Sequence, residues 1–109
     1  MERDNTYIHH ILDAITKIAE YTAGMTEDAF LASPVVGDAV LRQLEIIGEA
    51  ARHVSEEGRA NFPQIPWPKI VGLRNRLIHE YFNVDWRIVW QAVVADLPSL
   101  RADLEKVVK

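Results

Sequence analysis

The sequence predicts an all-α protein, an up-and-down four-helix bundle with an additional short helix. Every long segment repeats its apolar residues at three- and four-residue spacings, and no segment alternates with the period of a strand. Proline- and glycine-containing stretches separate most of these segments. With 109 residues, 49% hydrophobic and 26% charged, the composition is typical of one globular helical domain that spans residues 1–109.

The first two helices are predicted from apolar spacing and capping residues. Residues 6–22 carry isoleucines at helical spacing, Asn5 or Thr6 can cap their start, and Gly24 can end the helix. Residues 26–31 open with a threonine followed by two acids, which predicts a short helix before the next Ser-Pro pair.

A second long helix is predicted over residues 34–57, with its end at Gly58. Its apolar residues cover more than half of the helix circumference, so it has two surfaces to bury. The second surface is either a subunit interface or a contact with another helix of the same chain. Gly48 and the alanines beside it would permit a close approach in either case.

Prolines and an aspartate define the remaining helices. Residues 61–68, "NFPQIPWP", form a connection that is not helical throughout, and Pro68 lies in the first turn of the next helix. That helix is predicted to end near Phe82. Asp85 then caps a last helix, which Pro98 should kink or restart because it lacks a backbone N–H.

Charge and composition exclude several classes of function. The net charge of −4 does not favour nucleic-acid binding through the overall field, so a phosphate contact must be local. Residues 69–79 hold three cations and no acid. The chain has no cysteine, and neither a membrane-spanning run nor a signal peptide is recognisable, which predicts a cytoplasmic protein without a membrane contact.

The stretch "RNRLIHEYF", residues 74–82, combines fixed cations with a titratable histidine. Arg74 falls inside the apolar arc of its helix, where an arginine needs a carboxylate, a ligand phosphate or a cavity. Glu45 and Glu49 are the natural structural partners. His79 lies about 140° from Arg74 around the helix axis, so the two share a face only if the helix end is distorted or two copies meet.

The spacing of Arg74, His79 and Tyr81 is moderately specific. Chance gives roughly 0.3 Arg-x4-His pairs in a chain of this composition, and about 0.01 once the tyrosine is required. The motif resembles the R-x4-H-x-Y signature of HEPN-domain proteins of the HepT type, the toxin partners of minimal nucleotidyltransferases. The resemblance covers nearly the whole chain and includes "LEIIGEAAR" (44–52) and "VDWRIVWQAV" (84–93).

The resemblance implies a helical homodimer in which two R-x4-H motifs face each other in a cleft. The implied activity is metal-independent RNA cleavage by the toxin of a type VII toxin–antitoxin system. A cognate nucleotidyltransferase (MNT) antitoxin would neutralise it by transferring AMP to a tyrosine, here Tyr81. In some members the modified tyrosine lies two residues after the motif arginine, a position that Arg76 occupies here, which leaves the mode of neutralisation open.

The residue types fit this chemistry independently of the resemblance. RNA is cleaved without a metal or other cofactor when its own 2′-hydroxyl is activated, which needs a group that titrates near pH 7 and a cation on the phosphate. His79 is suited to the first role and Arg74 to the second. Asn75 could orient His79 or the phosphate, Arg76 adds a cation, and Glu49 could position Arg74.

Two other functions remain open from the sequence. The chain could be a non-catalytic subunit that binds a nucleotide or a substrate for a nucleotidyltransferase. It could also be a plain dimerisation bundle in which an Arg74–Glu49 pair is structural, with Tyr81 packed in the core. Metal catalysis is disfavoured because adjacent histidines point in different directions and Glu45 and Glu49 have no histidine at ligand spacing. The three histidines outside the motif are expected on a solvent face: His9, His10 and His53.

Overall fold

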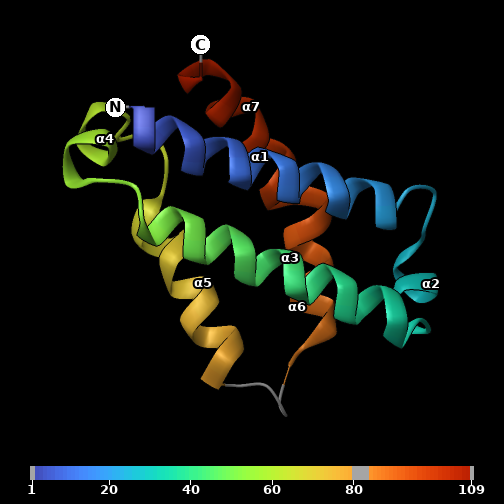
Figure 1. The fold of residues 1–109 in the computed structure, drawn as a ribbon. Helices are drawn as coiled ribbons and strands as arrows, with labels where there is room; N and C mark the ends of the chain where they lie inside the picture. The colour runs from blue at the N-terminus through green and yellow to red at the C-terminus, as the bar shows by residue number, and fades with distance from the viewer. Residues whose placement is uncertain (1, 80–83, 109) are drawn as a thin grey trace.

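The computed structural model describes residues 2–79 and 84–108, and the side chains of residues 3–73 and 84–108. The described residues form helices without any strand, which confirms the predicted all-α bundle (Figure 1). The long helices are α1 (Glu2–Tyr21), α3 (Pro34–Arg52), α5 (Trp67–His79) and α7 (Leu97–Val107). The short ones are α2 (Glu27–Leu31), α4 (Glu56–Asn61), α6 (Trp86–Gln91) and the π-helical segment η2 (Ala92–Asp96).

Helix α3 lies at the centre of the bundle, between α1 and α5 (Figure 1). Its inward side chains are almost completely buried, and so are those of α1 that meet them: Val40, Leu44, Ile47, Ile8, Ile11 and Ile18. The wide apolar arc of α3 is therefore covered on two sides within the chain. Of the two explanations that the sequence left open, packing between neighbouring helices accounts for the arc.

The end predicted for the second long helix is wrong. Helix α3 stops at Arg52, and Gly58 lies inside the short helix α4. The hydroxyl of Ser55 accepts a hydrogen bond from the Gly58 N–H (3.0 Å), which caps a new helix at that point. The chain turns there because Asp4, 51 residues away, holds Ser55 in place.

Asp4 ties the start of α1 to the start of α4. Its carboxylate accepts hydrogen bonds from the backbone N–H of Ser55 (2.9 Å) and from the Ser55 hydroxyl (2.6 Å). Burial raises the pKa of Asp4. The two hydrogen bonds from Ser55 and the charge of Arg3 together lower it by a larger amount, so the net pKa lies below its ordinary value. Beside it, the Arg59 guanidinium donates to the carbonyls of Ala51 and Arg52, which end α3.

The first helix begins earlier than the sequence predicts, at Glu2, and ends at Tyr21. Gly24 follows with a φ of 74°, a conformation that favours glycine, so its place just after the helix is as predicted. Helix α5 begins as predicted at the Trp67-Pro68 pair. Its predicted end near Phe82 lies outside the described residues.

The last helical stretch confirms both residues on which its prediction depended. The Asp85 carboxylate caps α6 by accepting from the N–H groups of Arg87 (3.0 Å) and Ile88 (3.4 Å). Ahead of Pro98 the chain widens into η2, where the Leu97 N–H donates to the carbonyl of Ala92, five residues back. A new α-helix, α7, then starts with Pro98 in its first turn.

Candidate functional site

The helix that carries the predicted motif is held firmly at its beginning. Trp67 retains 4% exposure, and its indole N–H donates to the carbonyl of Phe62 (3.1 Å). Ile70, one turn further on, is also buried. Because α5 packs along α3, this anchored first turn sets the direction in which the motif positions follow.

Four predicted site residues lie on α5: Arg74, Asn75, Arg76 and His79. Their side chains lie outside the described part of the structure, and so does Tyr81 altogether. The α-helical backbone continues through His79. In a regular helix, five residues correspond to a rise of about 7.5 Å and a rotation of about 140°, so the positions of Arg74 and His79 lie on different sides of α5.

Glu49, predicted to position Arg74, lies on the outward stripe of α3. Its Oε2 atom is 2.8 Å from Nη2 of Arg52 and 3.0 Å from Nε2 of His53. The hydrogen bond and the negative charge of Glu49 raise the pKa of the Arg52 guanidinium. Glu45 contacts Arg42 at 3.7 Å. The contact of Glu49 or Glu45 with Arg74 stays a prediction.

The expectation that Glu49 has no histidine at ligand spacing is wrong, because His53 follows one turn later and its ring contacts the carboxylate. Among the described residues, no three His, Cys, Asp or Glu side chains gather closely enough to hold a metal ion. Nor does any helix of the described part have the length and apolarity needed to cross a membrane.

An apolar hollow of about 330 Å³ lies beside α5, between that helix and the α6–α7 stretch. Its floor is apolar and well buried, formed by side chains of four elements: Leu44, Ile47, Ile70, Val89, Leu97 and Leu100. Its polar lining is mainly acidic, with Asp85, Asp96 and Asp103 against one cation, Lys69. The hollow thus lies beside the helix that carries the motif, but its lining is acidic rather than basic.

A second hollow of about 240 Å³ lies between α1 and α3. Tyr7 stacks on His53 with ring centroids 5.1 Å apart, and His10 approaches the Tyr7 ring edge-on at 5.9 Å. His9, His10 and His53 are all exposed, as predicted, but the last two also belong to this ring cluster. The sequence spacing of Tyr7 and His10, three residues, indicates a shared helix face. No sequence signal reveals the stacking of Tyr7 on His53, because it depends on how α1 packs on α3.

Comparison with known proteins defines the class to which this helical bundle belongs. Residues 11–107 match the family described as ribonuclease HepT-like. This match covers α3, the motif helix α5 and the α6–α7 stretch, and most of α1. The chain therefore belongs to the ribonuclease HepT-like family, which confirms the family resemblance of its sequence.

Several relatives are similar over nearly their whole length. A protein of Thermococcus cleftensis named probable ribonuclease HepT is 40% identical over 94% of each chain. A candidate RNase of Methanocaldococcus jannaschii is 38% identical over 91% of each chain. A candidate RNase of Caldanaerobacter subterraneus subsp. tengcongensis is 35% identical over all of this chain and 97% of its own. No solved structure matches the chain.

Proposed function

We propose that this protein is the toxin of a type VII HEPN/MNT toxin–antitoxin system and acts as a metal-independent endoribonuclease. Membership of the ribonuclease HepT-like family carries the proposal, together with relatives whose names assign ribonuclease activity. The positions of Arg74 and His79 on one helix support a site at the far end of α5.

The proposed reaction is attack by the RNA 2′-hydroxyl on the adjacent phosphorus. His79 removes the proton of that hydroxyl, the 2′ oxygen bonds to phosphorus, and the bond to the 5′ oxygen of the next nucleotide breaks. The products are a 2′,3′-cyclic phosphate and a free 5′-hydroxyl, which takes up a proton. Arg74 stabilises the charge that develops on the phosphate oxygens, while Asn75 and Arg76 orient and bind the strand.

The helix geometry supports a homodimer as part of the proposal. In one copy, Arg74 and His79 occupy positions about 140° apart on a regular helix, so they do not readily meet on one substrate phosphate. Two copies of α5 packed about a two-fold axis would place Arg74 of one copy near His79 of the other. This arrangement supplies each cleft with both groups without distorting the helix.

Neutralisation by a cognate MNT nucleotidyltransferase is the second part of the proposal. Tyr81 lies two residues beyond His79 and is the proposed AMP acceptor. An adenylyl group there would add bulk and negative charge beside the phosphate-binding residues, which would exclude RNA from the cleft. Glu49 is proposed to hold Arg74 in position.

Cleavage of a mixed RNA pool in the presence of EDTA tests this function. The chain is purified without its antitoxin and compared with His79→Ala and with the control His9→Ala, which replaces an exposed histidine on α1. We expect the parent and the control to cleave and the His79 variant to lose at least about 100-fold in rate. The RNA ends should carry 2′,3′-cyclic phosphate.

Absence of cleavage by the unmodified parent would contradict the ribonuclease proposal. Binding of ATP or AMP by that inactive chain would instead indicate a nucleotide-binding subunit of a nucleotidyltransferase complex. A structural role for Arg74 predicts a different result, because Arg74→Ala would then lower the melting temperature substantially.

A further inference from the structure

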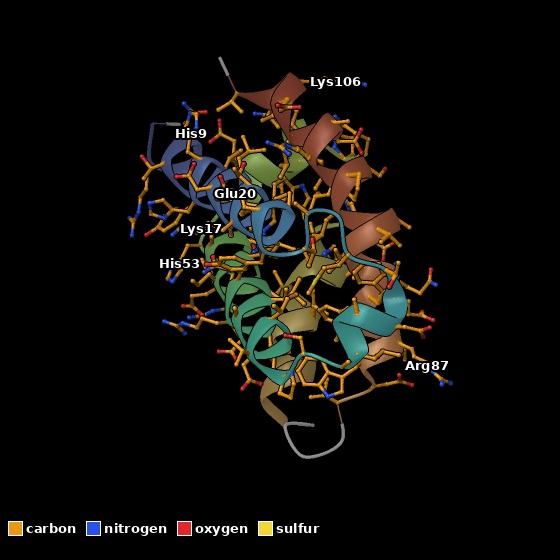
Figure 2. All side chains as sticks on the ribbon, turned by 90° about the vertical axis from the view of Figure 1, so that its right-hand side faces the viewer. His9, Lys17, Glu20, His53, Arg87 and Lys106 are labelled. Carbon is orange, nitrogen blue, oxygen red and sulfur yellow. The ribbon has the colours of Figure 1, made fainter. Side chains whose placement is uncertain are left out.

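The hollow between α1 and α3 has the features of a small ligand site that the proposed reaction does not use. Eight residues line it: Tyr7, His10, Arg42, Glu45, Ile46, Glu49, Ala50 and His53. Three of them carry aromatic rings, two carry carboxylates and one a guanidinium. Figure 2 shows His53 on the outer side of the molecule where α1 and α3 lie next to each other.

The ring cluster presents one exposed ring, that of His53, for stacking. Tyr7 and His53 lie nearly parallel, with an interplanar angle of 19°, and His10 stands at 90° to Tyr7. The side chain of His53 keeps 41% of its surface exposed, so the stack is open to solvent. An exposed ring such as that of His53 accepts an unpaired RNA base, which stacks on it with a gain of about 1 to 3 kcal/mol.

The two carboxylates of the hollow have different partners. Glu49 contacts both Arg52 and His53 at hydrogen-bond distance. Glu45 has a looser contact with Arg42, at 3.7 Å, and its side chain is 29% exposed. Arg42 itself is 70% exposed, so this pair can open at little cost in free energy.

A carboxylate beside a stacking surface selects among bases by their edges. A carboxylate accepts hydrogen bonds and cannot donate them at neutral pH. The Watson–Crick edge of guanine presents two parallel donors, the N1–H and the 2-amino group, whereas adenine and cytosine present one amino group and uracil a single ring N–H. Glu45 therefore matches guanine best, and Arg42 is placed to meet a neighbouring phosphate.

We propose that this hollow between α1 and α3 binds an unpaired guanine base of RNA. The base stacks on the exposed His53 ring, which Tyr7 backs from the other side, Glu45 accepts its two Watson–Crick donors, and Arg42 contacts the flanking phosphate. The charges of Arg42 and Glu45 balance, as suits a site that reads a base rather than one that only holds the backbone.

The position of the hollow relates it to the proposed cleavage site. Helix α3 packs on α1 along one side and on the motif helix α5 along another. Glu49 lines the hollow and is also the residue proposed to position Arg74. The hollow lies on the α1 side of α3, away from α5 (Figure 1), so a single strand bound at the α5 motif would have to pass over α3 to place a base in it. RNA as the ligand rests on the proposed function, but the base site can be tested without any cleavage.

The test follows the ring signals of His10 and His53 by NMR during titration with GMP, AMP, CMP or UMP. The His79→Ala chain is used beside the parent, so that binding at the motif is recognised separately. We expect GMP to shift both signals in either chain and to bind about tenfold more tightly than UMP. Because mononucleotides are not cleaved, this result does not depend on ribonuclease activity.

Two matched pairs of variants separate the base contact from general effects. Glu45→Gln replaces one acceptor oxygen by an amide donor and should weaken GMP binding about tenfold while leaving AMP binding unchanged. Its control is Glu20→Gln, at an exposed glutamate at the other end of α1. His53→Ala should weaken binding of all four nucleotides, whereas His9→Ala should change none of them.

Three results would overturn the base site. They are unshifted His10 and His53 signals with every nucleotide at millimolar concentration, equal binding of GMP and UMP, or a Glu45→Gln variant that binds GMP like the parent. Shifts of the His79 signal alone would place nucleotide binding at the motif and also contradict the inference. An inactive chain that still binds GMP through Glu45 would contradict the ribonuclease proposal and leave the base site standing.

Discussion

The two flanks of α5 are built differently. At the start of α5, polar contacts of four residues join α1, α3, α4 and the connection before α5: Asp4, Ser55, Arg59 and Trp67. We term this group of residues the tied end. On its other side, the first two turns of α5 face the α6–α7 stretch across the 330 Å³ apolar hollow. The contrast indicates that polar contacts hold the side of α5 that adjoins α4, whereas the side that faces α6 and α7 is loosely filled. Functional regions are commonly drawn from the less tightly packed parts of a protein.

The largest expected effect at the tied end is that of Gly58→Ala. A Cβ at this position would collide with Oδ2 of Asp4 and lie 3.2 Å from Cγ1 of Val54. Because Asp4 is buried and bonded to Ser55, it cannot move away without losing those bonds. We expect a loss of about 3 kcal/mol in the free energy of unfolding. Thermal unfolding should show a Tm lower by roughly 10 to 15 °C.

The matched control is Gly72→Ala on α5, where no atom of the described residues lies within 4 Å of the added Cβ. Alanine should stabilise this exposed helical position by up to about 1 kcal/mol. Equal effects of the two substitutions would show that the tied end is not sterically special.

Asp4→Asn should have the next largest effect. The substitution keeps the shape but removes the charge that strengthens the two hydrogen bonds from Ser55. We expect a loss of about 1 to 2 kcal/mol at neutral pH, measured by urea unfolding. The fold should be retained.

The pH dependence of this difference follows from the lowered pKa of Asp4. Its stabilising contribution is fully present above the ordinary value of 3.8 and is lost as the pH falls through the lower folded-state pKa. The gap in unfolding free energy between the parent and Asp4→Asn should therefore shrink below about pH 4. A gap that widens on acidification would contradict the proposed role of the Asp4 carboxylate.

The smallest effect is expected beside the apolar hollow, for Asp85→Ala. The carboxylate caps α6 through two backbone N–H groups, and its loss should cost about 1 kcal/mol. Asp85→Asn keeps an accepting oxygen and should differ from the parent by a few tenths of a kcal/mol. Urea unfolding of the parent and both variants would measure these differences in the free energy of unfolding. A loss at Asp85 as large as that at Gly58 would remove the difference between the two flanks.

Local signals in the sequence account for the elements that were predicted correctly. Asp85, Pro98 and the Trp67-Pro68 pair act on their own neighbours, so their effects on helix starts are readable from the chain alone. The end of α3 was missed because Ser55 is held by Asp4, a contact between residues 51 positions apart. A capping serine is visible in sequence, but the carboxylate that fixes it is not.

The candidate sites divide in the same way. The motif positions Arg74 and His79 were assigned to one helix from spacing, and α5 contains both. The ring cluster of Tyr7, His10 and His53 was missed because stacking between α1 and α3 depends on the rotation of each helix about its axis. Periodicity predicts which face is buried, but not which exposed side chains meet across a helix pair.

The π-helical segment η2 changes the phase of the last helical stretch. A π turn holds one residue more than an α turn, so the side chains after Asp96 are rotated relative to a continuous α-helix. Before it, α6 packs on α2, and after it, α7 packs on α1. The continuous helical stretch α6–η2–α7 thus packs on both α2 and α1. An α-helix without the π turn would direct the side chains of α7 to a different face. The number of residues in η2 is therefore as much a determinant of the fold as their identity.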